Sequence, residues 1–173
     1  LNTLDKASLI MILSLFIGIM GTVPRHELIH RKKNKFDQFI GKLLLSLSWD
    51  CTFAIEHVHG HHKNVGYEND PATAKRNQSV YRFVLNAIIK EHSDAWNIEL
   101  KELKRRDLGV LTFKNNMMLG YIRSLSLTII IYVFGGLFSL TCFIMCSFIA
   151  KAFLEVINFT EHYGLVLEQG KPV

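Results

Sequence analysis

An uncharged stretch of 27 residues, 124–150, constrains the fold of this 173-residue chain more than any other feature. As one α-helix it would extend about 40 Å, whereas the hydrocarbon core of a bilayer is about 30 Å thick. Gly135 and Gly136 lie near its middle and favour a turn there. We therefore expect a hairpin of two membrane-spanning helices, at about 117–134 and 139–160. One long, tilted helix is the alternative.

A second uncharged run, residues 7–23, is long enough for a short membrane-spanning helix of about 25 Å. Lys6 precedes this run, but the flank that follows it is much more basic. Its cations are Arg25, Arg31, Lys32, Lys33 and Lys35. Because basic flanks remain in the cytoplasm, we expect the end after residue 23 to be cytoplasmic. The three spans together predict an all-α, polytopic membrane bundle.

Residues 36–55 are apolar overall but contain Asp37, Lys42 and Asp50, with Trp49 beside the last. Charged side chains are costly within a membrane span, and tryptophan favours the membrane interface. We therefore expect a helix that lies in the cytoplasmic interface and does not cross the bilayer.

The central part of the chain, residues 62–116, is polar and basic, so we expect it to be cytoplasmic, with one or two amphipathic helices over 79–106. Of the 20 Lys and Arg residues, 17 lie between residues 24 and 123, so the net charge of +5 reflects topology. We expect no nucleic-acid partner, because no binding motif and no aromatic interleaving accompany these cations. The sequence starts close to one hydrophobic segment and has no signal-peptide features. We interpret residues 1–173 as a single-domain internal fragment of a longer membrane protein.

Five of the eight histidines fall in two dense groups. The first is HELIH, residues 26–30, in which His26 and His30 share one helical face. Taken alone, this pattern is typical of zinc metallopeptidases, with Glu27 as the base.

The second group is EHVHGHH, residues 56–62. His57 and His61 repeat the one-turn spacing, and His62 adds a ligand on an adjoining face. Five imidazoles exceed the three protein ligands of a typical catalytic zinc site, so the number of ligands argues for two metals. Imidazole binds iron, copper, nickel and zinc, and ligand type alone leaves the metal open.

A third element, NFTEHYG, occupies residues 158–164 at the end of the expected return helix. Glu155, Asn158 and His162 share a helical face there, and two crossings return that face to the side of the histidine groups. We expect His162 to be a metal ligand and His92 to lie on the surface. His59 should either face solvent or contact a ligand without binding the metal itself.

These motifs resemble those of the membrane-bound alkane 1-monooxygenases, which belong to the histidine-box superfamily that includes fatty-acid desaturases. HELIHR at 26–31 matches the family's HELxHK box, with Arg31 in place of lysine. EHVHGHH matches EHxxGHH without change. NFTEHYG matches NYxEHYG, which desaturases lack, with Phe159 in place of tyrosine. The resemblance covers nearly the whole chain.

The resemblance implies a non-haem di-iron centre with nine histidine ligands. Six of them would be His26, His30, His57, His61, His62 and His162. The family's further box, LQRHSDHH, is not among the 173 residues, so we expect this fragment alone to be incomplete. The side chains expected to orient the imidazoles are Glu27, Glu56, Glu155, Asn158 and Glu161.

The implied function is hydroxylation of the terminal methyl group of medium-chain n-alkanes to 1-alcohols with O2. The implied electron donor is rubredoxin, which rubredoxin reductase reduces with NAD(P)H. The implied location is a bacterial inner membrane, with the active site facing the cytoplasm. The alternatives are a xylene-type methyl hydroxylase, a fatty-acid desaturase, an intramembrane zinc peptidase and a non-catalytic membrane metal-binding protein.

Overall fold

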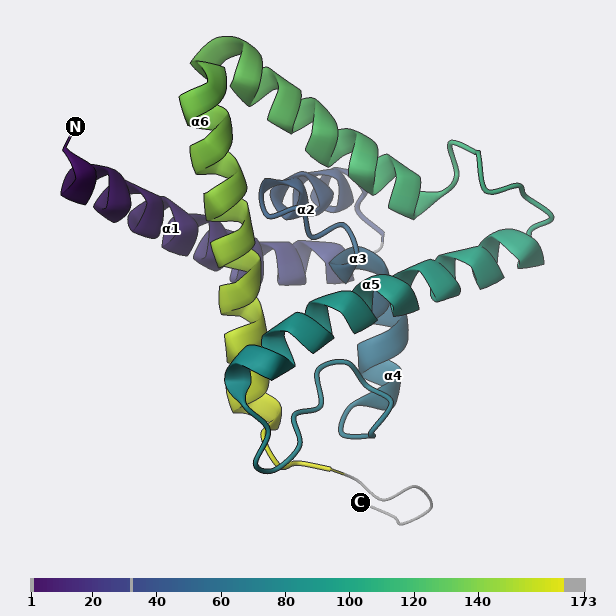
Figure 1. Ribbon diagram of the computed structural model, residues 1–173. Helices are drawn as coiled ribbons and strands as arrows, with labels where there is room; N and C mark the ends of the chain where they lie inside the picture. The colour runs from purple at the N-terminus through teal and green to yellow at the C-terminus, as the bar shows by residue number, and fades with distance from the viewer. Residues whose placement is uncertain (1, 32, 167–173) are drawn as a thin grey trace. The chain divides into compact units, whose positions relative to one another are not determined.

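The computed structural model describes residues 2–31 and 33–166, and these residues form helices and no β-strand (Figure 1). The all-α fold class is therefore confirmed. In chain order the helices are α1 (Thr3–His30), α2 (Lys35–Leu47), α3 (Phe53–Glu56), the π-helix η1 (His57–His61), α4 (His62–Asn64), α5 (Val80–Arg105) and α6 (Asn116–His162).

The helices group into two compact units. Unit 1 contains the chain as far as Cys51, together with Met118–Phe153. Unit 2 contains Thr52–Met117 and the chain from Leu154 onward. The first histidine group therefore belongs to unit 1, and the second group and His162 belong to unit 2.

Helix α1 begins with a capping box, which satisfies backbone groups that a helix start leaves unpaired. The Asn2 side chain accepts from the backbone N–H of Asp5 at 2.8 Å, and the Asp5 carboxylate accepts from the N–H of Asn2 at 3.1 Å. The helix continues past Pro24 and includes both histidines of the first group. The uncharged run at residues 7–23 and the first histidine group therefore share one helix.

Helix α6 doubles back on itself (Figure 1). Its one non-helical residue is Gly136, with φ 69° and ψ −170°, a conformation in which a side chain would be strained. Phe134 and Leu137 flank this turn and are 88% and 70% exposed. Helices α1 and α6 are both long and apolar enough to cross a membrane. Exposed apolar side chains such as Phe134 and Leu137 are costly in water and not in lipid, so the chain is a membrane protein.

Helix α2 is shorter than the helix expected over residues 36–55. It ends at Leu47, where Trp49 adopts a left-handed φ of 55° and the N–H of Asp50 donates to the carbonyl of Leu45 at 3.0 Å. This 6→1 hydrogen bond closes the helix and redirects the chain. With 13 residues, α2 extends only about 20 Å.

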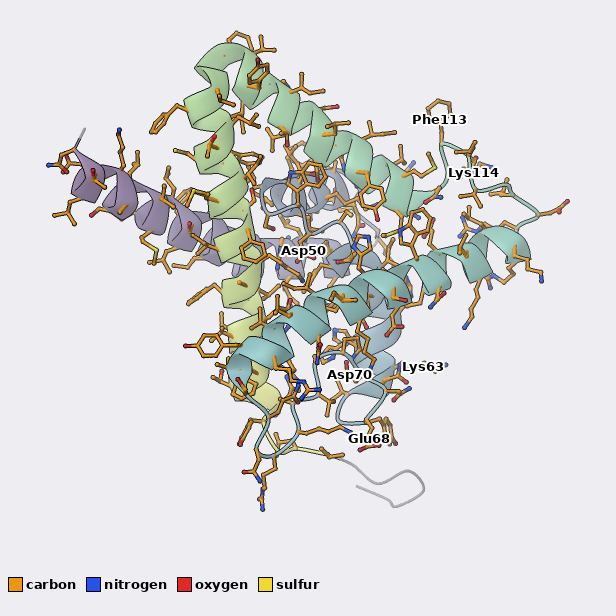
Figure 2. The ribbon with its side chains drawn as sticks, viewed as in Figure 1. Asp50, Lys63, Glu68, Asp70, Phe113 and Lys114 are labelled. Atoms are coloured by element: carbon orange, nitrogen blue, oxygen red, sulfur yellow. The ribbon has the colours of Figure 1, made fainter. Side chains whose placement is uncertain are left out.

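Three buried charges hold unit 1 together at the end of α2. The Asp50 carboxylate, labelled in Figure 2, forms two ion pairs. It lies 3.1 Å from Arg25 Nη1 of α1 and 3.2 Å from Lys151 Nζ of α6. Arg25 also donates to Ser48 Oγ at 3.3 Å. Asp50 is only 1% exposed, so both ion pairs are shielded from water. We expected Asp50 to mark the membrane interface, and the sequence did not identify its two partners.

Unit 2 is built on α5, which buries an apolar stripe along its length. Its apolar buried residues are Phe83, Val84, Ala87, Ala95 and Leu103. The end of α6 is fastened to the loop that precedes α5. There the N–H of Gly164 donates to the carbonyl of Ala74 at 2.8 Å, and the N–H of Asn77 donates to the Tyr163 hydroxyl at 2.9 Å. This connection fixes the position of His162 within unit 2.

Candidate metal centre

The first histidine pair lies on one face of α1, as the one-turn spacing predicts. Nε2 of His26 and Nε2 of His30 are 3.3 Å apart. Metal–nitrogen bonds are about 2.0–2.1 Å long, so two imidazoles on one ion place their nitrogens about 3 Å apart. The spacing of this pair therefore fits two ligands of a single metal ion.

The second histidine group forms a π-helix, which changes its expected pairing. The N–H of His62 donates to the carbonyl of His57, five residues back. As a result His57 and His62 are the closer pair: their ring centroids are 4.6 Å apart, whereas those of His57 and His61 are 5.2 Å apart. The Nε2 atoms of His57 and His62 are 3.1 Å apart. The sequence identified these histidines but not this pairing, because one-turn spacing assumes an α-helix. π-Helical turns occur frequently at functional sites.

Gly60 permits this turn. A Cβ atom at Gly60 would overlap the carboxylate of Glu56 and would lie 3.3 Å from Cδ1 of Ile98 on α5. Glu56 is buried beneath the turn. The glycine of EHVHGHH therefore gives Glu56 room to lie against the turn that carries the histidines.

His61 is oriented by a buried carboxylate from the following loop. Its Nδ1 lies 2.9 Å from Oδ2 and 3.1 Å from Oδ1 of Asp70 (Figure 2 labels Asp70). Burial favours the neutral ring, but the hydrogen bond and charge of Asp70 and the charges of Glu56 and Glu161 raise the pKa of His61 overall. A carboxylate accepts the Nδ1 proton, so Nε2 of the neutral ring keeps a free lone pair for a metal.

The third element brings His162 beside His61. Their ring centroids are 5.2 Å apart and the rings are perpendicular. Nδ1 of His162 lies 3.0 Å from the backbone carbonyl oxygen of Asn158. Because a carbonyl only accepts, Nδ1 carries the proton, and Nε2 is again available as a ligand. The one-turn spacing within NFTEHYG therefore correctly predicts that Asn158 lies beside His162.

The residues expected to orient imidazoles have diverse surroundings. Glu155 is fully buried and accepts from Nδ2 of Asn158 at 3.0 Å. Glu161 is exposed and acts on His61 through its charge. Glu27 is paired with Arg31 instead: its Oε1 accepts from Nε at 3.1 Å, and its side chain is 64% exposed.

Two further histidines and one aspartate complete the assignment. His59 and His92 are exposed, as expected for side chains at the surface. Asp70 is the partner of His61 that sequence reasoning missed, because Asp70-Pro71 is typical of a turn and does not by itself indicate a contact with a histidine. An aspartate in a rigid turn nine residues after His61 was the available signal.

Comparison with known proteins identifies the family. The model of the fatty acid desaturase family matches residues 6–172. The chain belongs to the fatty acid desaturase family. The matched range includes every histidine expected to bind a metal. Family membership and the histidine groups together indicate a metal cofactor.

Several relatives of this chain are oxygenases by name. Alkane 1-monooxygenase 1 of Pseudomonas aeruginosa is 34% identical over 97% of this chain and 44% of its own length. Alkane 1-monooxygenase 2 of Alcanivorax borkumensis is 35% identical over 86% of this chain and 38% of its own length. The hydroxylase component of the xylene/toluene monooxygenase of Pseudomonas putida is 29% identical over 98% of this chain and 46% of its own length. The chain therefore spans less than half the length of these relatives.

Proposed function

We propose that the complete protein is a non-haem di-iron monooxygenase that converts medium-chain n-alkanes to 1-alcohols with O2. One observation carries the proposal: in unit 2, His61 and His162 both commit Nδ1 to an acceptor and lie with His57 and His62 in one group. The similarity to alkane 1-monooxygenases supports monooxygenation as the proposed reaction class.

The proposed centre contains both histidine groups. We propose that His26 and His30 join His57, His61, His62 and His162 around two irons, and that three further ligands lie outside these 173 residues. Bound iron supplies the redox chemistry with O2 that breaking an unactivated C–H bond requires and that acid, base or nucleophilic side chains do not supply. Zinc has no redox chemistry and does not fit this role.

The remaining parts of the chain have defined tasks in this proposal. Asp70 and the carbonyl of Asn158 hold the ligand rings. Glu56 lies against the π-helix, and Glu155 holds the side chain of Asn158. The apolar faces of α1 and α6 exclude water and admit a lipid-soluble substrate.

We also propose that both histidine groups face the cytoplasm of a bacterial inner membrane in a multi-pass protein. The basic flank after residue 23 supports this orientation. The length of α2 supports it independently, because about 20 Å is too short to cross a hydrocarbon core of about 30 Å. Without a crossing between them, His30 and His57 would remain on the same side.

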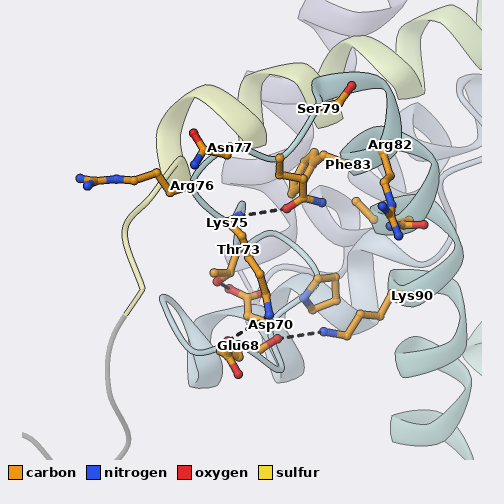
Figure 3. A pocket seen from close by; sticks show the side chains of 14 residues that line it. Glu68, Asp70, Thr73, Lys75, Arg76, Asn77, Ser79, Arg82, Phe83 and Lys90 are labelled. Carbon is orange, nitrogen blue, oxygen red and sulfur yellow. Dashed lines mark hydrogen bonds and ion pairs between the residues drawn. The ribbon is translucent and has the colours of Figure 1, made fainter.

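Electrons would come from rubredoxin, which we propose docks on a basic surface of unit 2. A cavity of about 570 Å³ opens there, and four cations line it, namely Lys75, Arg76, Arg82 and Lys90 (Figure 3). Lys75 is paired with Glu68 at 3.0 Å, whereas Arg76 and Arg82 are exposed. A surface of this charge suits an acidic donor and accelerates its association.

The test of docking separates it from the chemistry. Exchange of Arg82 and Lys90 for glutamate should raise KM for rubredoxin by about tenfold and weaken its salt dependence. Turnover driven by a small chemical reductant should not change. An unchanged KM for rubredoxin would refute this docking surface.

The test of the proposed function uses the complete protein with octane, 18O2, rubredoxin, its reductase and NADH. We expect labelled 1-octanol and two irons per chain. An alkene product would indicate a desaturase, and bound zinc without iron would indicate a peptidase or a metal-binding protein.

Methyl hydroxylation of an alkylaromatic is the second candidate, because the xylene/toluene relative covers 98% of this chain. Parallel turnover with xylene distinguishes it.

A further inference from the structure

We propose that Asp70 is a positioning residue that fixes the tautomer and ring orientation of the metal ligand His61. This inference rests on the function proposed above. Asp70 does not belong to either histidine group or to NFTEHYG.

Asp70 is held in place independently of His61. Its Oδ1 accepts from the backbone N–H of Ala72 at 3.0 Å, and its Oδ2 lies 3.4 Å from Oγ1 of Thr73. The first contact is the Asx-type hydrogen bond of a tight turn, which Pro71 makes more rigid. The side chain of Asp70 is fully buried. The carboxylate is therefore in position before any metal binds.

The chemistry of imidazole makes this preorganisation important. A neutral histidine can carry its proton on either nitrogen, and a flipped ring exchanges a nitrogen for a carbon. The Asp70 carboxylate selects the ring that points Nδ1–H toward it, because any other state leaves a buried charge without that donor. Nε2 then points away from Asp70, ready to bind a metal.

The effect of Asp70 should be confined to one ligand. His162 uses the backbone carbonyl of Asn158 for the same purpose, and no side-chain substitution removes that carbonyl. Asp70 also lines the cavity of Figure 3, so Asp70→Ala would enlarge an existing cavity.

The experiment compares Asp70→Asn with Asp70→Ala in the complete protein, with Asp94→Asn, a partly buried aspartate on α5, as the control for loss of one carboxylate. Asparagine preserves the volume and the contact with Ala72 but removes the charge. We expect iron to be held about 10–100-fold less tightly in Asp70→Asn, measured by competition with a chelator. The Mössbauer spectrum should show one altered iron site, and the melting temperature of the metal-free protein should match that of Asp94→Asn.

Two results would overturn the proposal: unchanged iron affinity and spectrum in Asp70→Asn, or a loss of iron that only parallels instability of the metal-free protein. If Asp70→Ala does not fold, Asp70→Asn alone decides the question. Failure of the proposed function is distinguishable, because wild-type protein would then hold metal without producing alcohol while the difference between Asp70→Asn and wild type remains measurable.

A different observation supports a second inference: we infer that the loop between α5 and α6, residues 106–115, inserts into the surface of a lipid bilayer. Leu111 and Phe113 are 87% and 90% exposed. Asn115 is fully buried and donates from Nδ2 to the carbonyl of Val110 at 3.0 Å, so the loop has a fixed shape with its apolar side chains outward.

Charge and continuity identify the lipid surface as the occupant. Lys114 is exposed and neighbours Phe113 in the loop (Figure 2), and Arg105 and Arg106, which pair with the Glu102 carboxylate, lie where the loop leaves α5. Apolar side chains flanked by cations are typical of segments that enter the interface of anionic membranes. Helix α6, a candidate membrane-spanning helix, begins at Asn116, directly after the loop.

The test places a spin label at Phe113→Cys in the complete protein, reconstituted in vesicles that contain anionic lipid. Cys142 is replaced by alanine, whereas Cys51 and Cys146 are buried and remain. We expect greater relaxation by oxygen than by a water-soluble nickel complex. The opposite ratio is expected at the control, Ile89→Cys on α5, which is 69% exposed. Nickel access at residue 113 would show that the loop lies in water, and protection from both reagents would show that protein covers it; either result overturns the inference.

Discussion

The two units each bury an aspartate, and the two aspartates have opposite kinds of partner. Asp50 in unit 1 lies between the cations of Arg25 and Lys151, whereas Asp70 in unit 2 accepts from an imidazole, a backbone N–H and a hydroxyl. Each is no more than 2% exposed. Burial alone therefore does not distinguish a carboxylate that fastens helices from one that orients a ligand; the partners do.

The largest expected effect lies at the ligand that Asp70 contacts. In the complete protein, His61→Ala should abolish alcohol formation and lower bound iron, because it removes a nitrogen that the proposed centre requires. His59→Ala, two residues away on the exposed side, should retain most activity. Iron analysis and product chromatography measure both. Full iron and activity in His61→Ala would remove the reason to assign Asp70 a role in the centre.

The next largest effect is expected in unit 1. Asp50→Asn leaves two buried cations without their counter-charge, which should cost about 3–5 kcal/mol of folding free energy. Denaturation of the detergent-solubilised protein measures this loss. Adding Lys151→Met should recover part of the stability, because it removes one of the uncompensated charges. If Asp50→Asn is as stable as wild type, the three charges do not hold unit 1 together.

A smaller effect is expected at the π-helix. Gly60→Ala places a methyl group against the carboxylate of Glu56 and close to Ile98, and such overpacking costs about 1–3 kcal/mol. Iron affinity should fall as well, because relief of the clash displaces the turn that carries His57 and His62. Gly109→Ala is the control, because no atom lies within 4 Å of a Cβ added there. Equal behaviour of the two variants would contradict the role assigned to Gly60.

The smallest effect is expected at Glu27. Its carboxylate is exposed and paired with Arg31, so Glu27→Gln should leave both the melting temperature and the iron content at their wild-type values. A large loss of iron in this variant would show that Glu27 orients an imidazole, which is the role the sequence suggests. The contrast between Glu27→Gln and Asp70→Asn would then disappear.

Periodicity and charge predicted the helical architecture well. The glycine pair in an uncharged run predicted the turn of α6, which occurs at Gly136. The end of α2 was not predicted, because Trp49 occupies a left-handed position usually taken by glycine. The bounds of α2 therefore depend on tertiary contacts, including the hydrogen bond from Trp49 Nε1 to Thr128 Oγ1 at 3.1 Å.

The local geometry of the histidine motifs was predictable in part. One-turn spacing identified the His26–His30 pair and placed Asn158 beside His162. It did not identify the His57–His62 pair, because that pair requires a π-helical turn at His57–His61. The formation of this turn depends on how Glu56 and Ile98 pack against Gly60. It also missed Asp70, because nothing in a local pattern shows which imidazole a loop carboxylate will reach.

The π-helical winding makes the spacing of EHVHGHH as important as its composition. An additional residue per turn brings the first and last imidazoles together across five positions. Exchanging Val58 for another apolar residue keeps that count, whereas deleting it would shorten the interval to four and rotate every downstream side chain by about 100° on an α-helix. The number of residues in this segment should therefore tolerate no insertion or deletion, even where individual side chains are replaceable.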